Sequence, residues 1–537
     1  MNRKIYTTIL AIFMVSALFA ADIVIKDADL GSATYEWTND NVYILDGYVY
    51  LEDGGVLNIE AGTVIKGMTV PSNGTDETSA LIITRGAKIN AEGTRDEPII
   101  FTAELDDLST TTDLTATTNL LWGGVIILGR APIGENINNP AENYPTDIVE
   151  GIPSDEIRIR YGGTDAMDDS GILRYVSIRH GGSILGGDNE INGLTLGGVG
   201  AGTTIDYVEV FANIDDGFEF FGGTVNATHI VSAFVGDEAF DFDESWNGHV
   251  QFAFAIQQDA DPEIGDHAIE YDGSEADDLG PKTVGRIYNA TLIGSGSQNN
   301  GNGNGLRLKS DGAAEFWNII WMDLDDYAFR VENTSVDRLN NGETVFAANL
   351  LWNYNTLYNG TGFSVNFEEA DPMLASISRI PNQQLDPRPI SGSPALTGAA
   401  EPTEEGVVVT SFRGAFGPAW NWADDWTALS SYGYFGDIAS STHDLASNNA
   451  GVVLANAEPN PVYKDQAQFN FELPKAGDAF ITVFNLQGQL VDRIDLGFQA
   501  EGKNAFQLNV ADYQSGLYIV ALNTELGNVT QKVMVYN

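Results

Sequence analysis

The sequence predicts an all-β fold, in which a long parallel β-helix (a solenoid) precedes a small Ig-like antiparallel β-sandwich. Three observations predict it. Short apolar stretches bounded by Gly, Asn and Asp recur along the chain, whereas helix signals are scarce. In the middle of the chain, segments of one pattern return about every 22 residues, as solenoid coils do. After Pro461 the pattern changes to alternating strands separated by short turns.

The composition excludes several classes of function. The 537 residues include 76 Asp and Glu but only 26 Lys and Arg, for a formal net charge of −50. Such a surface repels phosphate backbones, so we expect no nucleic-acid partner, and it attracts divalent cations. The absence of cysteine excludes disulfides, zinc–thiolate sites and cysteine nucleophiles.

Residues 1–21 have the pattern of a secretory signal peptide. Arg3 and Lys4 precede an apolar run over 9–19, and small residues follow it at Ala20 and Ala21. The run is about 11 residues long, against the ~20 that a membrane span needs. No later stretch is long enough to cross a membrane, so we expect an exported protein without a transmembrane span.

A solenoid of short strands is predicted over 22–436. Six segments share the pattern small–apolar–any–apolar, and their first residues lie 24, 22, 29, 37 and 23 residues apart. They begin at Gly193, Gly217, Ala239, Ala268, Gly305 and Ala328. A second family of apolar segments follows at similar spacing, and about 22 residues leave room for a third strand. The longer steps indicate loop insertions, including Gly294–Gly305. The short base period does not fit a propeller, which needs blades of about 40 residues.

Two features of the solenoid call for specific expectations. Asn289, Asn318 and Asn349 align at one position, which predicts an Asn ladder in a bend, each side chain bonding the backbone of the next coil. An aromatic-rich segment, about 401–436, follows the last coil. We expect its aromatic residues to close the open end of the helix, with a sugar-stacking platform as the alternative. They are Phe416, Trp420, Trp422, Trp426, Tyr432, Tyr434 and Phe435.

Several segments carry a resemblance to a known superfamily. Residues 55–67 and 93–103 resemble the opening coils of right-handed parallel β-helix proteins of the pectin-lyase-like superfamily. The segments at 121–129, 161–165, 190–200 and 215–225, and an ending like Phe412–Phe416, are similar to a family of secreted bacterial surface proteins. The resemblance covers roughly 50–436 and implies the fold and export; it implies no established activity.

The C-terminal part is predicted to be a separate module, residues 459–537, after a linker at 437–458. Six or seven short antiparallel strands fit a small sandwich. The motifs at 471–475, 483–488 and 515–518 resemble the type A C-terminal sorting domain that the type IX secretion system recognises. That resemblance implies the secretion machinery as a partner, a location at the cell surface or outside the cell, and either release or attachment to surface lipopolysaccharide. A carbohydrate-binding or fibronectin-like sandwich is the alternative.

The predicted coils place charged residues in two outward-facing columns. Since the flanking apolar residues face the core, the residue between them points outward, as does the next but one. The first column reads Thr195, Glu219, Asp241, Glu270, Arg307 and Arg330, and the second Gly197, Phe221, Asp243, Asp272, Lys309 and Glu332. With coils ~4.8 Å apart, five of the carboxylates share one small patch, namely Glu219, Asp241, Asp243, Glu270 and Asp272. Calcium, which takes about 6–8 oxygen ligands, suits such a patch.

This patch loosely resembles the calcium-dependent polysaccharide lyases of the superfamily. The resemblance implies Asp241, Asp243, Glu270 and Asp272 as calcium ligands, and Arg307 or Lys309 as the base, with a lowered pKa. A hydrolase would instead pair Asp241 with Asp243, since ~7 Å suits an inverting mechanism. No full motif of either class is present, and an ordinary solvated face with ion pairs between coils is the alternative.

The remaining candidates are weaker. His229, His249 and His267 lack zinc-ligand spacing, so packing or surface roles are expected, with His267 placed to support the Glu270 strand. The leading hypothesis is therefore a non-enzymatic surface or extracellular protein that binds glycan or another surface polymer, assisted by calcium. A polysaccharide lyase or glycoside hydrolase is the first alternative, and a structural or adhesive spacer is the second.

Overall fold

The computed structural model describes residues 21–134, 141–184, 190–259, 265–274, 282–296, 303–360, 365, 367–435 and 451–536, the last range without 456, 458, 460, 461, 464, 465, 486–489, 512, 514, 515 and 525. The expected signal peptide lies outside the described residues except for Ala21, which begins the first strand. Most of the expected linker and the middle of the loop 294–305 lie outside them too.

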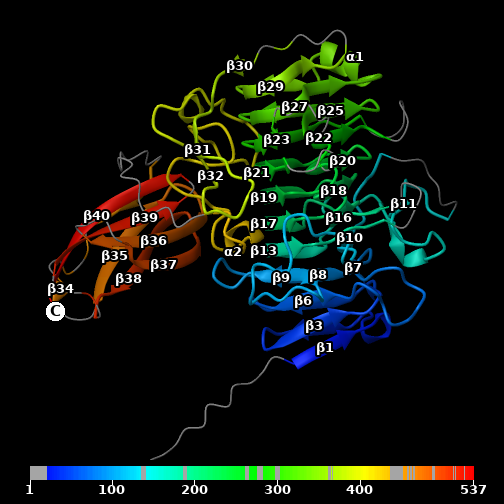
Figure 1. Cartoon of the computed structure of the whole chain (residues 1–537), viewed down its shortest axis with the longest axis horizontal. Coiled ribbons are helices and arrows are strands. Elements are labelled where there is room, and N and C mark those ends of the chain that lie inside the picture. The colour runs from blue at the N-terminus through cyan, green and yellow to red at the C-terminus, as the bar shows by residue number, and fades with distance from the viewer. Residues whose placement is uncertain are drawn as a thin grey trace, which may run out of the picture.

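The main body is a right-handed parallel β-helix, with three columns of strands that pair only with the coils before and after them (Figure 1). The first column contains β4 (Tyr48–Leu51), β7 (Ala80–Ile83), β10 (Val125–Leu128), β16 (Leu194–Gly197), β18 (Phe218–Phe221), β20 (Phe240–Asp243), β22 (His267–Asp272), β25 (Asn304–Lys309) and the end of β27 (Ile320–Val331). The second contains β2 (Thr34–Trp37), β5 (Val56–Ile59), β8 (Lys88–Glu92), the starts of β13 (Gly171–Arg179), β17 (Thr204–Phe211), β19 (Asn226–Ala233) and β21 (His249–Ile256), then β23 (Gly285–Tyr288), β26 (Ala314–Trp317) and β28 (Val345–Ala347). The third contains β1 (Ala21–Ile25), β3 (Asn41–Leu45), β6 (Val64–Gly67), β9 (Ile99–Ala103), the ends of β13, β17, β19 and β21, then β24 (Thr291–Ile293), the start of β27, β29 (Leu350–Tyr358) and β30 (Glu368–Glu369).

From β13 onward, one residue in each of seven successive coils makes the bend between the second and third columns. In successive coils it adopts the left-handed conformation, with φ between 48° and 60°. The position is occupied by Tyr175, Tyr207, His229, Phe252, Asn289, Asn318 and Ala348. The rings in this column stack, with centroids 4.4, 4.2 and 4.9 Å apart from Tyr175 to Phe252.

The Asn ladder expected from the sequence is wrong in two respects. Ile320 pairs with Leu350, so Asn318 aligns with Ala348, and Asn349 lies one residue further on. The Asn349 amide donates back to the carbonyl of Phe316 in the previous coil. Asn289 and Asn318 donate not to the next coil but to a later segment, since this column faces outward and another part of the chain covers it.

The core inside the coils is a continuous stack of apolar side chains. Phe220 and Phe242 stack at 4.8 Å between neighbouring coils, and Trp246 packs against both. Packing requires a glycine at Gly193, the first residue of its repeat, because a Cβ there would lie 2.3 Å from the side chain of Val210.

An insert between β10 and β13 covers the outer face of the early first column. It carries β11 (Asp147–Ile148), the 3-10 helix η2 (Ile157–Ile159) and β12 (Arg160–Tyr161), and β14 (Ser183–Ile184) with β15 (Glu190–Ile191) forms a hairpin after β13. Val149, Ile159 and Tyr161 of the insert form an apolar cluster with outward residues such as Tyr50 and Ile126. The insert ends beside β18, so the acidic strands above β18 lie next to its rim (Figure 1).

Residues 370–435, here called the side segment, do not close the open end of the helix as expected. They run along its flank, over the outward faces of the third column (Figure 1). They contain β31 (Leu374–Ser376), β32 (Asp386–Pro389), the 3-10 helix η3 (Pro394–Leu396) and α2 (Ala428–Ser431), and α1 (Ser335–Asn340) lies earlier, between β27 and β28. Outward apolar residues such as Phe211, Phe234 and Phe254 need this cover, and Trp422 and Trp426 supply part of it.

The C-terminal module is the expected sandwich. One sheet has the order β33 (Val453–Leu454), β35 (Gln466–Leu473), β38 (Gly502–Asn509), and the other β34 (Val462–Tyr463), β40 (Gly527–Tyr536), β39 (Gly516–Thr524), β36 (Gly477–Asn485), β37 (Leu490–Gln499). The module has its own apolar core between the sheets, including Phe469, Ile481 and Val520.

Candidate functional site

The strand register confirms the charged column that the sequence predicts. Thr195, Glu219, Asp241, Glu270, Arg307 and Arg330 are direct partners in successive first-column strands. In the second outward column, Asp272 pairs with Lys309. The parallel register thus brings residues two to three dozen positions apart to neighbouring coils.

Two further acidic columns precede each of these strands, and sequence reasoning missed them. One position before the repeat begins stand Asn192, Asp216, Glu238, His267, Asn304 and Tyr327, and one residue earlier stand Asp215, Asp237 and Asp266. The repeat alignment, extended by two positions toward the N-terminus, shows both columns. Most of these residues lie outside the apolar pattern that marks each strand, so that pattern alone does not single them out.

Together these residues form one acid face. We define the acid face as Glu150, Asp215, Asp216, Glu219, Asp237, Glu238, Asp241, Asp243, Asp266, Glu270 and Asp272. Oxygens of Asp216, Glu219 and Asp241 lie within 4.8 Å of one another. The same holds for Asp215, Asp216 and Asp237, for Asp237, Glu238 and Asp266, and for ligand atoms of Glu238, His267 and Glu270.

Burial and mutual repulsion raise the pKa of many of these carboxyl groups. Burial raises the pKa of Glu238 to about 8, and burial together with the charge of Asp243 raises that of Asp272 to about 8. Burial raises the pKa of Glu150, on the rim of the insert, to about 7. The pKa of Asp241 lies well above its ordinary value, through burial and then the charge of Glu270.

Two oxygens of the acid face have no hydrogen-bond partner among the described residues. They are Oδ1 of Asp241 and Oδ1 of Asp272, both buried. Asp272 as a whole is only 8% exposed. A buried carboxylate oxygen normally accepts a bond, so each of these is an acceptor without a donor.

The predicted bases are already engaged. Arg307 donates to Glu270 at 3.0 Å, and Lys309 lies 3.0 Å from Asp272 and also contacts Glu270. Burial alone would lower the pKa of Arg307 and Lys309, but the neighbouring carboxylates outweigh it and raise both. The expected lowered pKa of a catalytic base is therefore wrong, because the bases face the acids across one coil step.

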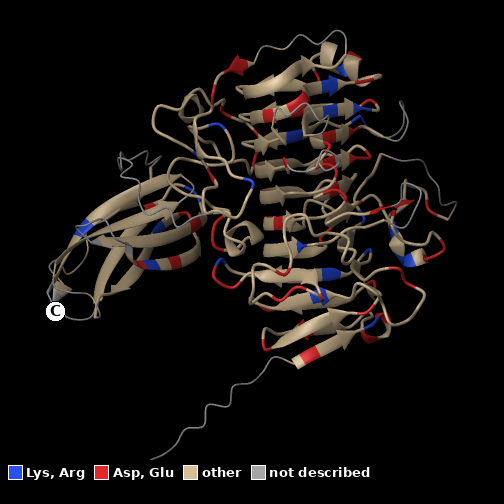
Figure 2. Cartoon of the chain, viewed as in Figure 1, with Lys and Arg blue, Asp and Glu red and all other residues tan. Residues whose placement is uncertain are grey.

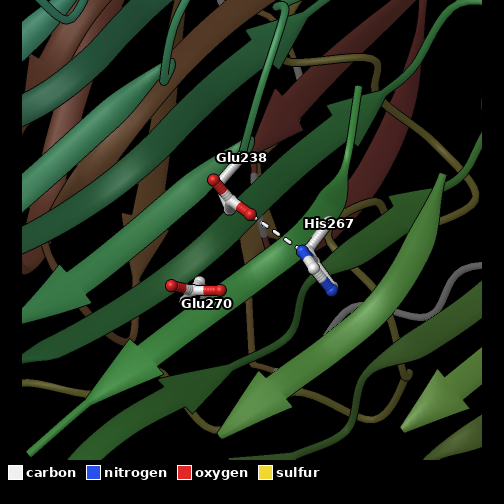
Figure 3. Close-up of side chains that lie close together, drawn as sticks. All are labelled: Glu238, His267 and Glu270. Atoms are coloured by element: carbon white, nitrogen blue, oxygen red, sulfur yellow. Dashed lines mark hydrogen bonds and ion pairs between the residues drawn. The ribbon is translucent and has the colours of Figure 1, made fainter. Parts of the chain in front are cut away.

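His267 is the third cation of this region. Its Nδ1 lies 2.8 Å from Glu238 (Figure 3). The same nitrogen lies 3.2 Å from Asp266, and Nε2 lies 2.6 Å from the hydroxyl of Tyr327. Burial would lower its pKa, but the bonds to Asp266 and Glu238 raise it well above the ordinary value. A protonated imidazole cannot ligate a metal, so His267 acts as a counter-ion. His229 stacks in the bend column and His249 is largely buried, in agreement with the packing roles expected for these two histidines.

The comparisons with known proteins agree with this architecture. A family model described as a pectate-lyase-like β-helix domain matches residues 30–377, well over half of the chain. The chain belongs to the pectate-lyase-like β-helix family. The match starts earlier and ends earlier than the expected resemblance over 50–436, leaving most of the side segment outside it.

A second family model, described as a secretion system C-terminal sorting domain, matches residues 458–536. The C-terminal sandwich of this pectate-lyase-like protein is thus a type IX sorting domain, and the protein is exported to the cell surface or the extracellular space. None of the described helices is long and apolar enough to cross a membrane.

Two other comparisons add little. No curated protein matches the chain. Among solved structures, the enzymatically active domain of tailspike protein 2 of bacteriophage CBA120 is 9% identical, with 92% of this chain and 72% of that chain covered and a TM-score of 0.19. A TM-score this low supports no conclusion about fold or activity.

The charge balance of the acid face decides what this pectate-lyase-like β-helix can do there. Three cationic side chains, His267, Arg307 and Lys309, oppose a much larger set of carboxyl groups, and all three lie toward the later coils. Figure 2 shows how few basic residues the helix carries overall. Toward the insert, the acids around Asp241 must share protons or take up external cations.

Proposed function

We propose that the acid face holds divalent cations, best suited to calcium, and that the protein uses them to bind an acidic glycan or other surface polymer outside the cell. The single observation that carries the proposal is the pair of buried, partnerless oxygens on Asp241 and Asp272 within a crowd of carboxylates. Calcium takes about 6–8 oxygen ligands, including carboxylates and solvent, in a flexible geometry.

The residues that would hold the cation are Glu219, Asp241, Asp243, Glu270 and Asp272. Glu270 and Asp272 already share the charge of Lys309, so the cation would sit toward Asp241 and Glu219, where no base neutralises the acids among the described residues. A bound cation with open coordination positions would accept carboxylate or hydroxyl oxygens of a polymer. The parallel coils would offer such a polymer a long, straight track.

A polymer-binding measurement tests this function. We expect the full chain to be retarded in gels that contain acidic polysaccharide and calcium, and to run freely with a chelator. Asp241→Asn should reduce the retardation, whereas the exposed-site control Glu92→Gln should not. Equal mobility in calcium and in chelator on every polymer tried would count against the proposal.

A glycoside hydrolase is a second candidate, favoured by one observation. A general acid needs a raised pKa, and the pKa of Asp241 is raised next to Asp243, two positions along the same strand. The lyase alternative has less support, because the raised pKa values of Arg307 and Lys309 oppose a role as base. Product release from a panel of acidic and neutral glycans, lost in Asp241→Asn, would favour the hydrolase. A spacer would neither bind nor cleave, but its deletion would change cell adhesion.

A further inference from the structure

The sorting module lies against the flank of the β-helix (Figure 1), and Phe480 of the module packs against Trp420 of the side segment. Neighbouring residues Ile481 and Val483 of β36 point into the module's own core. Phe480 points the other way, is only 7% exposed, and belongs to the apolar cluster of the side segment. An outward phenylalanine on an isolated sandwich would be left in water, so its surroundings are built by the helix.

Two arginines and a tryptophan enclose this ring. The guanidinium of Arg95, from the turn between β8 and β9, lies 5.1 Å from the Phe480 centroid, and that of Arg493, from β37, lies 4.6 Å from it. Trp420 of the side segment packs against the ring at 5.2 Å. Cations within about 6 Å of a ring face attract it, and more strongly when water is excluded.

One carboxylate joins the two arginines. Oδ2 of Asp425 accepts from Nε of Arg95 at 3.1 Å and lies 2.5 Å from Nη1 of Arg493. Asp425 holds the left-handed conformation, with φ 78°, which is uncommon for a residue other than glycine. The unfavourable backbone conformation of Asp425 thus lies where the helix, the side segment and the module meet.

The contact also contains features that oppose it. Burial and the charge of Arg95 lower the pKa of Arg493, since two guanidinium groups face each other. Nη1 of Arg95 and Nε1 of Trp420 are buried with no acceptor among the described residues. Arg95 is 3% exposed and Trp420 6% exposed, so water does not supply one freely. Such a contact is specific in shape but limited in strength.

We propose that Arg95, Trp420 and Asp425 form a docking site for the protein's own sorting module, which Phe480 and Arg493 engage as a releasable latch. The docked module keeps one orientation on the β-helix in solution. Its β36–β37 side is then occupied, so the secretion machinery meets the other side of the module or displaces it from the site. Departure of the module exposes Trp420 and frees the two donors that the docked state leaves without acceptors.

Distance measurements between two spin labels test the latch in the full chain. The chain has no cysteine, so Ile157→Cys on the insert and Val453→Cys on the module, both exposed, give a unique labelled pair. We expect one narrow distance distribution. Phe480→Ala and Asp425→Asn should each broaden it, with the docked fraction falling about tenfold. Val491→Ala is the matched control, since this β37 side chain is 38% exposed, and it should leave the distribution narrow.

If Phe480→Ala disturbs the folding of the module, Asp425→Asn still tests the contact, because Asp425 belongs to the side segment and not to the module. Asparagine also tolerates the left-handed backbone conformation of this position. High salt should broaden the unsubstituted distribution, because it screens the Asp425 bridge. A broad distribution in the unsubstituted chain, or a narrow one in both variants, overturns the proposal.

Discussion

At the residue scale, the two oxygens without donors on Asp241 and Asp272 are the feature that distinguishes the acid face from an ordinary charged surface. Exposed acids on a β-helix would bond water or pair with bases on the next coil, as Arg307 and Glu270 do. Asp241 instead lies close to Glu219 and Asp216, and burial together with the charge of Glu270 raises its pKa. In the absence of a cation, ionisation of Asp241 in the folded chain lowers the free energy of unfolding.

The first prediction follows from that cost. In chelator, Asp241→Asn should raise the stability of the chain by about 1 kcal/mol, because asparagine neither takes up a proton on folding nor adds a charge to the acid face. With calcium the order should reverse, since the variant lacks a ligand. Thermal unfolding in both buffers checks this, with Glu92→Gln as the exposed control. A variant less stable than the parent in chelator would contradict the repulsion on which the account rests.

The second prediction concerns pH. Glu150, Glu238 and Asp272 have folded pKa values of about 7 to 8, above the ordinary 4.5 and 3.8. Between the two values the folded chain holds protons that the unfolded chain has lost, so stability falls as the pH rises. In chelator we expect the melting temperature to drop by a few degrees from about pH 5.5 to about pH 8.5. Calcium should flatten the slope, and a melting temperature that rises over this range would be inconsistent with the buried acids.

Residue columns could be predicted from the sequence where a strict repeat sets the register. Glu219, Asp241 and Glu270 align because each lies two positions after the first residue of its repeat, between two apolar residues of the strand. The protonation of the bases could not be predicted, because it depends on which carboxylate each side chain reaches. Asp216 and Glu238 were not predicted because they lie just before their strands, where the repeat pattern has no apolar residue.

At the element scale, a buried acid of the β-helix, Glu209, holds the side segment on the flank. The repeat pattern does not predict this role. Glu209 of β17 is fully buried and accepts from the amides of Ala428 and Leu429 at the start of α2, and from the hydroxyl of Ser177. Burial raises its pKa, although Arg179 and these donors act against the rise. The acid thereby ties two helix coils to the side segment.

The third prediction tests that tie. Glu209→Ala should destabilise the chain by about 2–4 kcal/mol, because it leaves two amides and the Arg179 charge without their buried partner. Hydrogen exchange should quicken at α2 before it changes in the first column. Equal exchange at α2 in parent and variant, under conditions where both are folded, would show that Glu209 does not hold the segment.

The aromatic segment was predicted as an element but not in its position. Its composition indicated that it covers apolar surface, and the open end was the nearest exposed edge. In the structure it lies instead on the flank, where Phe211, Phe234 and Phe254 form one apolar cluster with it. The off-by-one alignment of Asn349 has a similar cause, since β27 and β29 are long and the bend residue there is Ala348.

At the scale of the whole molecule, the solenoid followed from the sequence because a coil repeat is a one-dimensional property. The period, the positions of the insertions and the change of pattern near residue 460 could be counted along the chain. The packing of the insert, the side segment and the sorting module on the helix could not, because it joins residues hundreds of positions apart, such as Arg95 and Asp425. The carboxylates of the strands could therefore be aligned from the repeat. The insert at their rim and the contact of the sorting module with the helix could be seen only in the structure.

Uptake of divalent cations by the acid face can be measured by calorimetric titration of calcium into the full chain. We expect saturable binding with a Kd of about 10⁻⁴–10⁻³ M, as in other extracellular sites. We also expect that the double variant Asp241→Asn, Asp272→Asn loses this binding, while Glu92→Gln keeps it. Heat no greater than dilution for the unsubstituted chain, or an identical isotherm for the double variant, would contradict cation uptake by the acid face.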